Sequence, residues 1–243
     1  MKDNFSSQAK AYAQFRPHYP LELFAHLFAL VTTKDAAWDS GTGNGQVAGV
    51  FANHFREVFA TDISRQQINE AVQKSNIFYS VQPAEKTNFA SGRFDLVTAA
   101  QAIHWFRFDD FYAEAKRTLK PGGIIAVIGY GLVQTGPAIQ SIIDHFYTKI
   151  IGPYWDAERH YIDEAYQTIP FPFEEISLPA CQIVYQWSFE QLIGYIGTWS
   201  AVKHYNKQNN EDPVLLIKDA LRSAWGNQPA HSFIFPVLAR VGR

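Results

Sequence analysis

The segment Ala36-Ala37-Trp38-Asp39-Ser40-Gly41-Thr42-Gly43-Asn44-Gly45 places a short apolar run directly before a turn that contains three glycines. The residues that follow, from Gln46 to Phe55, have the pattern of a helix. Glycines let the backbone turn tightly, and they let a ligand approach main-chain atoms that a Cβ would cover. A strand, a glycine turn and a helix in this order predict a nucleotide-type ligand at the carboxyl end of a parallel strand.

The spacing of these glycines distinguishes between cofactors. A dinucleotide fingerprint has the pattern Gly-x-Gly-x-x-Gly, in which the third small residue packs the helix on the strand. Here Gly41, Gly43 and Gly45 lie two apart, and Gln46 stands where the third small residue is expected. Asp39 at the tip of the strand is also foreign to that pattern. A nucleotide-dependent oxidoreductase of Rossmann type is therefore the alternative and not the favoured interpretation.

A second carboxylate follows the next predicted strand. Residues 57–61 read as a buried strand, and Asp62 comes directly after it. Because the carboxyl ends of parallel strands meet at one edge of a sheet, a carboxylate there can accept hydrogen bonds from both hydroxyls of a ribose. Asp62 alone is equally typical of a turn or a helix cap. Its occurrence together with the glycine turn favours the ligand-binding role.

Around the glycine turn and Asp62, strand-like and helix-like segments alternate as far as Tyr130. This alternation predicts an α/β fold with an open, mostly parallel sheet. Up to this residue we expect further strands at 76–82, 94–100 and 124–128, and helices at 20–31, 64–73 and 109–119, with a break at 120–123. Beyond it we expect helices at 138–150, 189–204 and 213–225, and paired strands at 181–187 and 232–241. The change of pattern indicates an elaboration within a single domain, 1–243. We divide it into an N-terminal lid and helix (1–35), a cofactor-binding core (36–130) and a substrate cap with the last strand pair (131–243).

The composition of the chain limits the kinds of partner and the cellular location that we expect for it. Its 243 residues, 47% of them hydrophobic, suffice for one large core without disulfides. The single cysteine, Cys181, cannot form an internal disulfide and favours a reducing, cytoplasmic location. A net charge of −2 argues against nucleic acid as a partner. The chain opens without the pattern of a signal peptide, and its longest nearly apolar run, 123–133, is too short to cross a bilayer.

Two further absences complete these expectations. The eight histidines form no HExxH motif and no Cys/His cluster, so we expect no metal. We also expect no membrane association and no obligate protein partner. The partner that the sequence predicts is a small-molecule substrate.

The motifs of the first half, taken together, resemble those of one enzyme family. They are, in chain order, Asp39 to Gly45, Asp62, Pro83-Ala84-Glu85, Phe94-Asp95-Leu96-Val97 and Leu119-Lys120-Pro121-Gly122-Gly123. In this order they resemble the class I S-adenosylmethionine-dependent methyltransferases over about residues 36–128. Ser40 and Thr42 depart from the usual residues of the glycine motif, but neither change removes a backbone contact.

A narrower resemblance is to the small-molecule branch of this family, the methyltransferase type 11 domains that include trans-aconitate methyltransferase-like proteins. It rests on residues 5–20, on Ala100-Gln101-Ala102-Ile103-His104-Trp105-Phe106, and on Gly197-Thr198-Trp199-Ser200. The resemblance implies a Rossmann-like, seven-stranded sheet in the order 3-2-1-4-5-7-6, with the last strand antiparallel. It also implies helices on both faces of the sheet and a helical cap insertion.

The resemblance also implies roles for the matching residues. Asp39 would face the amino group of the methionine moiety of S-adenosylmethionine, and Asp62 would hold the ribose. The other implied cofactor contacts are Gly41, Thr42, Gly43 and Gly45 under the amino-acid part, Ile63, Ala84 and Glu85 around the adenine, and Ala100 and Gln101 near the sulfonium. Tyr12, Arg16 and Tyr19 are expected to form a lid over the cofactor.

The sequence demands no catalytic residue, because the cofactor supplies the difficult chemistry of methyl transfer. His104 is nevertheless a candidate. The neutral imidazole could accept a proton as a general base, or the imidazolium cation could stabilise an acidic acceptor. Alternatively, His104 could only form a hydrogen bond with the backbone of its loop. Arg16 is available to a carboxylate acceptor or to a surface acid. We expect Arg16, Tyr19, Trp105 and Trp199 to contact the substrate.

The acceptor group stays open between a carboxylate and a hydroxyl. A carboxylate is already ionised at neutral pH and needs no base. Transfer to a hydroxyl needs one. A protein that binds S-adenosylmethionine without catalysis is the third interpretation.

Overall fold

The computed structural model describes residues 15–243, so the predicted lid residue Tyr12 lies outside the described residues. In this part of the chain, strands form a seven-stranded sheet in the order β3-β2-β1-β4-β5-β7-β6. The strands are β1 (Ala36–Ser40), β2 (Glu57–Asp62), β3 (Ile77–Val81), β4 (Phe94–Ala100), β5 (Leu119–Tyr130), β6 (Gln182–Trp187) and β7 (His231–Gly242). The first five pair in parallel, and β7 runs antiparallel to both β5 and β6. The predicted strand order and its antiparallel last strand are confirmed.

The centre of the sheet is covered on both faces. Strand β1 is buried at every position, as is typical of a parallel strand between two helical layers. Its Ala37 packs in a cluster with the helices α2 (Leu21–Leu30) and α3 (Gln46–Phe51). The neighbouring Trp38 points to the opposite face and packs against Phe111 of α5 (Phe108–Thr118). Successive side chains of a strand alternate between faces, so adjacent residues reach two different cores.

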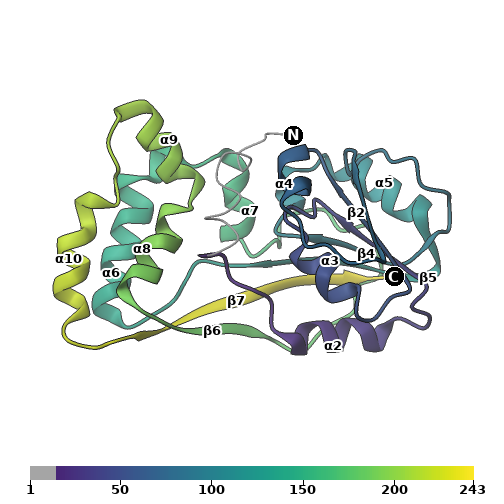
Figure 1. Cartoon of the computed structure of the whole chain (residues 1–243), viewed down its shortest axis with the longest axis horizontal. Helices are drawn as coiled ribbons and strands as arrows, with labels where there is room; N and C mark the ends of the chain where they lie inside the picture. Colours follow the sequence, from purple (N-terminus) through teal and green to yellow (C-terminus); the bar gives the residue numbers. More distant parts are fainter. Residues whose placement is uncertain (1–14) are drawn as a thin grey trace.

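A helical cap packs at the far end of the sheet (Figure 1). Its main helices are α6 (Pro137–His145), α7 (His160–Asp163), α8 (Phe189–Gly197), α9 (Ser200–Asn209) and α10 (Leu215–Trp225). Figure 1 shows α6, α8, α9 and α10 grouped on the left, joined to the sheet on the right by β6 and β7. The cap has its own aromatic core, in which Trp187 and Trp225 pack against Phe233 of β7.

Strand β7 connects the two parts. Its first residues, His231 to Pro236, pair with β6, and its last, Val237 to Gly242, pair with β5. One strand therefore takes part in both the cap and the central sheet.

The structure corrects several predicted boundaries. The helix expected at 64–73 is only α4 (Arg65–Asn69), although Ser64 does cap it by accepting a hydrogen bond from Gln67 N at 3.3 Å. The segment 120–123 is not a break, because it forms the start of β5 with a shift in register against β4. The helix expected at 138–150 changes from α to π geometry after His145. The helix expected at 109–119 starts one residue earlier, at Phe108.

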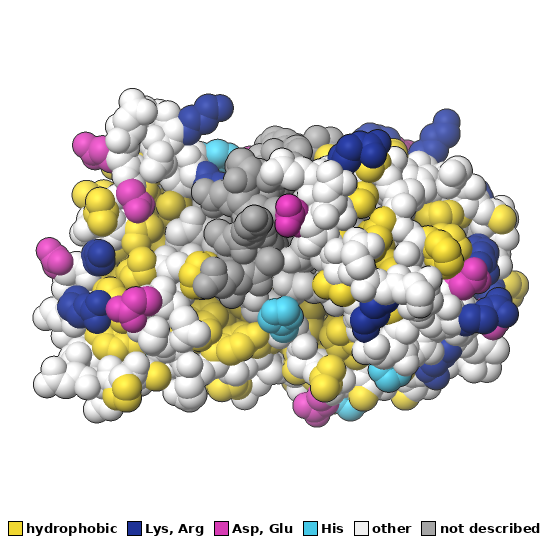
Figure 2. Space-filling view, viewed as in Figure 1, with side chains coloured by type: hydrophobic (Ala, Val, Ile, Leu, Met, Phe, Trp, Pro, Cys, Tyr) yellow, Lys and Arg dark blue, Asp and Glu magenta, His cyan; other side chains and the backbone are white. Residues whose placement is uncertain are grey.

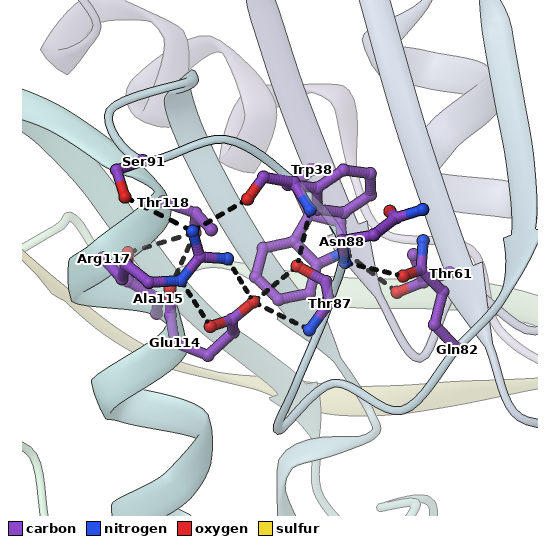
Figure 3. A network of polar contacts seen from close by, with 11 residues as sticks. Trp38, Thr61, Gln82, Thr87, Asn88, Ser91, Glu114, Ala115, Arg117 and Thr118 are labelled. Carbon is purple, nitrogen blue, oxygen red and sulfur yellow. Dashed lines mark hydrogen bonds and ion pairs between the residues drawn. The ribbon is translucent and has the colours of Figure 1, made fainter.

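The loop between β3 and β4 is tied to α5 by the polar network of Figure 3. The carboxylate of Glu114 accepts hydrogen bonds from the backbone and hydroxyl of Thr87 and from the guanidinium of Arg117. Arg117 also donates to the backbone carbonyl of Phe89. The loop that follows the third strand is therefore held to the helix that packs beneath it.

The surface carries mixed charge. On the face shown in Figure 2, acidic and basic side chains are interspersed, with hydrophobic side chains exposed between them. Over residues 15–243, no helix has both the length and the apolar character needed to cross a membrane.

Candidate active site

A cavity lies at the carboxyl ends of β1, β2 and β4. It brings together residues from five separate parts of the chain, the last of them Tyr130 at the end of β5. The sequence-predicted residues that line it are Asp39, Gly41, Thr42, Gly43, Asp62, Ile63, Ala100, Gln101, Trp105, Arg16 and Tyr19. This is the position in which an open parallel sheet binds its ligand.

Asp39 is the most deeply buried charged group of the cavity, with 1% of its surface exposed. Its Oδ2 accepts hydrogen bonds from Thr42 Oγ1 at 2.5 Å and Ala48 N at 3.2 Å, and its Oδ1 accepts one from Thr98 Oγ1 at 3.2 Å. Burial raises the pKa of this carboxyl to about 6, although these hydrogen bonds act to lower it. A cationic ligand group would stabilise the ionised form, so Asp39 suits an ammonium.

The three glycines of the turn have positive φ, but they differ in what surrounds them. A Cβ at Gly41 would lie 2.7 Å from Ala102 Cβ, and one at Gly45 would lie 2.3 Å from Tyr79 Oη. Packing therefore requires glycine at both positions. At Gly43 a Cβ would have a single neighbour within 4 Å, the side chain of Gln67 at 3.9 Å. Gly43 thus leaves open a space in the cavity that a side chain would fill.

Asp62 joins this turn to the next one. Its Oδ2 accepts a hydrogen bond from Gly43 N at 2.9 Å, and its Oδ1 accepts one from Ser64 N at 2.8 Å. These bonds fix the carboxylate at the wall of the cavity. A carboxylate in this position is an acceptor of the kind that the hydroxyls of a ribose require.

Three predicted cofactor residues are not in the cavity wall. Gly45 is the N-cap residue of α3 and does not occur among the described residues that line the cavity. Ala84 and Glu85 are buried but do not occur among the described residues that line the cavity. Glu85 instead accepts a hydrogen bond from the backbone of Arg107 at 3.1 Å. It thereby holds the segment that follows Trp105 and Phe106, both of which line the cavity. The contact of Ala84 and Glu85 with adenine stays a prediction.

Gln101 has a backbone φ of 53°, in the left-handed region that side chains other than glycine rarely adopt. Its Oε1 accepts a hydrogen bond from Tyr130 N at 2.9 Å, and its Nε2 donates to Tyr130 O at 3.4 Å. The side chain therefore joins the ends of β4 and β5 at the cavity wall. Backbone conformations of this kind concentrate at functional sites.

A second, smaller cavity adjoins the first. Arg16, Gln101 and Trp105 line both cavities. The remaining wall consists of His104, three residues of the cap segment 155–159, Ile162, and Trp199 with Ser200. The predicted substrate residues Arg16, Trp105 and Trp199 therefore meet here, whereas Tyr19 lines only the first cavity.

His104 is 5% exposed, and its Nδ1 lies 3.4 Å from the hydroxyl of Tyr166. Burial and the guanidinium groups of Arg159 and Arg16 lower its pKa to about 3. The imidazole is therefore neutral at physiological pH, which argues against the cationic role considered from the sequence. Its side-chain partner in the described part of the chain is Tyr166 and not the loop backbone.

The comparisons with known proteins agree with this geometry. Residues 38–127 match the family model described as "Methyltransferase domain". A Dictyostelium discoideum protein, provisionally named a methyltransferase, is 34% identical over 239 residues, which cover 97% of this chain and 91% of that protein. The chain belongs to the S-adenosylmethionine-dependent methyltransferases.

Two further comparisons describe the relatives of this methyltransferase. A solved structure from Anaeromyxobacter dehalogenans, provisionally described as a type II methyltransferase, has a TM-score of 0.87 and 36% identity, covering 94% of this chain and 98% of that one. A malonyl-[acyl-carrier protein] O-methyltransferase of Enterobacter lignolyticus is 34% identical over 90 residues, 36% of each chain. The oxidoreductase alternative is therefore set aside.

The first cavity of this methyltransferase suits its cofactor. S-adenosylmethionine carries an ammonium and a ribose diol, for which the buried Asp39 and the cavity-facing Asp62 are chemically matched. The open space at Gly43 leaves the backbone of the turn accessible from the cavity. Within residues 15–243, no group of three or more His, Cys, Asp or Glu side chains is arranged to hold a metal ion.

Sequence reasoning missed several residues of the two cavities. Gln67 is 4% exposed and lines the first cavity. Its spacing from the capping residue Ser64 could have indicated that it lies close to the end of β2. Asp156 and Arg159 line the second cavity. They belong to a short irregular segment of the cap, where no periodic pattern distinguishes a cavity residue from a surface one.

Proposed function

We propose that this methyltransferase transfers a methyl group to an oxygen of a small carboxylic acid. The observation that carries the proposal is the second cavity, which two guanidinium groups, those of Arg16 and Arg159, line against one carboxylate, that of Asp156, so that positive charge is in excess. Guanidinium groups bind carboxylates through paired, charge-assisted hydrogen bonds. The name of the Enterobacter relative, an O-methyltransferase, supports oxygen as the accepting atom.

S-adenosylmethionine, when bound, supplies a methyl carbon that its sulfonium has already activated. The residues of this chain then have to bind the acceptor, orient it and exclude water. The indole rings of Trp105, Trp155 and Trp199 form apolar walls of the second cavity. Correct positioning of two reactants contributes about 7–11 kcal/mol to a reaction of this kind.

The state of His104 favours a carboxylate over a hydroxyl. A group with a pKa of about 3 is a poor base for a hydroxyl at neutral pH. A carboxylate acceptor is ionised without help. Neutral His104 then serves to orient the acceptor.

The test is a screen of small carboxylic acids, phenols and amines with S-adenosylmethionine labelled in its methyl group. We expect the label to appear in methyl esters, which release it as methanol on mild alkaline treatment. Label that accumulates only in alkali-stable ethers or methylamines would contradict the proposal.

Kinetics across pH then test the role of His104. A general base would give a rate that rises through the histidine range and a loss of about 10²–10⁴-fold in His104→Ala. We expect instead a turnover rate that is flat between pH 6 and 9, and a smaller loss in His104→Ala that appears mainly as a higher KM.

The other expectations from the sequence are part of this proposal. We propose a cytoplasmic, single-domain enzyme whose partner is a small molecule. It needs no metal, nucleic acid, membrane or obligate protein partner.

A further inference from the structure

Arg159 is held by one edge of its guanidinium group. Its Nε donates hydrogen bonds to Tyr147 Oη at 2.6 Å and to Asp163 Oδ1 at 3.3 Å. The hydroxyl of Tyr147 in turn donates to the same Asp163 oxygen at 2.7 Å. Within residues 15–243, every hydrogen bond of the Arg159 side chain is made by Nε. Its two terminal nitrogens are therefore available to a ligand in the second cavity, which Arg159 lines.

Aromatic rings fix the orientation of this group. The guanidinium carbon lies 4.9 Å from the centre of the Trp155 ring and 5.3 Å from that of Tyr147. The side chain is 17% exposed, so it is largely removed from water. A preoriented, partly desolvated guanidinium presents the parallel N–H pair that a carboxylate accepts.

Arg16 is engaged differently. Its Nη1 donates to Tyr130 Oη at 3.3 Å, and its Nη2 donates to the backbone carbonyl of Thr198 at 3.2 Å. Arg16 lines both cavities, whereas Arg159 lines only the second. A group bound to Arg159 is therefore separated from the wall that the two cavities share.

We propose that Arg159 is a specificity-determining residue that binds an anionic group of the acceptor other than the group that is methylated. This inference rests on the proposed function, because it concerns the acceptor of that same reaction. The methylated group lies at the shared wall of Arg16, Gln101 and Trp105, next to the cofactor cavity. The second anion lies at the terminal nitrogens of Arg159, and Tyr147 with Asp163 positions them.

The experiment measures binding separately from turnover. The full chain is saturated with S-adenosylhomocysteine and titrated calorimetrically with succinate, glutarate and phthalate. Each diacid is compared with its monoamide, in which one carboxylate is replaced by a neutral group of the same shape. For the diacid that binds best, we expect a preference over its monoamide of about tenfold or more, as a charge-assisted pair would give.

Variants assign this preference to Arg159. Arg159→Gln should reduce it to less than about threefold, and Arg159→Lys, which keeps the charge but loses the paired geometry, should give an intermediate value. Tyr147→Phe keeps the ring contacts with Trp155 and Trp199 but removes the nearer of the two partners of Arg159 Nε, so it should lower the preference several-fold. The matched control is Arg222→Gln, an exposed arginine of α10 paired with Glu190, which should behave as the parent.

No preference for any diacid in the parent, or an equal preference in Arg159→Gln, would overturn the inference. An unchanged preference in Tyr147→Phe would overturn the positioning role. Failure of the proposed function looks different: the diacid preference then persists in the parent, but labelled S-adenosylmethionine yields no methyl ester.

Discussion

Asp39 shows how a single residue can favour binding at the cost of stability. Its carboxylate is buried beneath the glycine turn, and its pKa of about 6 means that the folded, ligand-free protein resists its ionisation. A raised pKa of this size corresponds to about 3 kcal/mol of folding free energy lost at neutral pH. A bound ammonium group would stabilise the ionised carboxylate and so restore part of the lost folding free energy.

We therefore expect Asp39→Asn to stabilise the cofactor-free protein at pH 8 while weakening S-adenosylmethionine binding by more than about 100-fold. The asparagine oxygen can accept from Thr42 and Ala48, and its amide can donate to Thr98. Because the folded pKa is raised, the cost of the carboxylate is complete above pH 6 and disappears as the pH falls toward 4.

Thermal unfolding at pH 8, 6 and 4.5, with calorimetry of cofactor binding, measures both effects. A variant that is less stable than the parent at pH 8 would contradict the role of burial.

Gly43 gives a second prediction at this scale. Gly43→Ala should weaken cofactor binding at least about tenfold, because the new methyl group enters the open space of the cavity. The backbone strain of alanine at positive φ is separate, and Gly92→Ala controls for it. Gly92 has a φ of +64°, an added Cβ there would meet nothing within 4 Å, and the residue lies outside the cavity lining.

Both variants should lose similar stability in urea unfolding, and only Gly43→Ala should lose affinity in calorimetry. Equal affinity in the two variants would remove Gly43 from the binding site.

At the scale of elements, the network around Glu114 fixes the loop between β3 and β4 to α5 (Figure 3). Burial alone would raise the pKa of Glu114, but hydrogen bonds from Arg117 and Thr87 outweigh it and hold the pKa below its ordinary value. A lowered pKa contributes stability that is present above the unfolded value and is lost as the pH falls through the folded value.

Glu114→Gln should accordingly destabilise the protein by about 1–2 kcal/mol at pH 7, and the difference from the parent should shrink as the pH falls below the ordinary glutamate pKa of 4.5. Urea unfolding at pH 7, 5 and 3.5 measures it. Glu190→Gln is the control, because that exposed carboxylate of α8 forms an ion pair with Arg222 and should contribute no measurable stability. A difference that is as large at pH 3.5 as at pH 7 would mean that shape, and not charge, accounts for the effect.

The elements also show what the sequence could predict. The strands near the glycine turn could be predicted, because each is an apolar run and a glycine or an aspartate marks its end. The helix expected at 189–204 is instead two helices, α8 and α9. The chain turns at Thr198, whose backbone and hydroxyl both donate to Tyr195 O. Trp199 then adopts an extended conformation and packs against Trp155. That contact comes from a distant segment, so no local pattern reveals the turn.

The same distinction applies to the two cavities. Asp39 and Asp62 were predictable as cavity residues because each lies at the carboxyl end of a strand that the sequence itself delimits. Arg159 was not, since its position depends on how the 152–163 segment packs over His104. The lining of the first cavity depends on local motifs, and that of the second depends on tertiary packing.

At the scale of the whole molecule, β7 makes the sheet and the cap interdependent. Its first half completes the cap with β6, and its second half covers the edge of β5 from Ile125 to Tyr130. The cap core also contains residues of β7, among them Phe233 and Phe235.

This shared strand limits how the protein can be divided for engineering. A fragment that ends at Tyr130 contains the glycine turn and Asp62, but it leaves six residues of β5 without their antiparallel partners. Such an apolar, unprotected edge promotes association between chains. We expect this fragment to be insoluble when expressed alone and to become soluble when co-expressed with residues 131–243, as the soluble fraction of each culture would show. A split reporter built from this enzyme would then regain cofactor binding only through reassembly at β7.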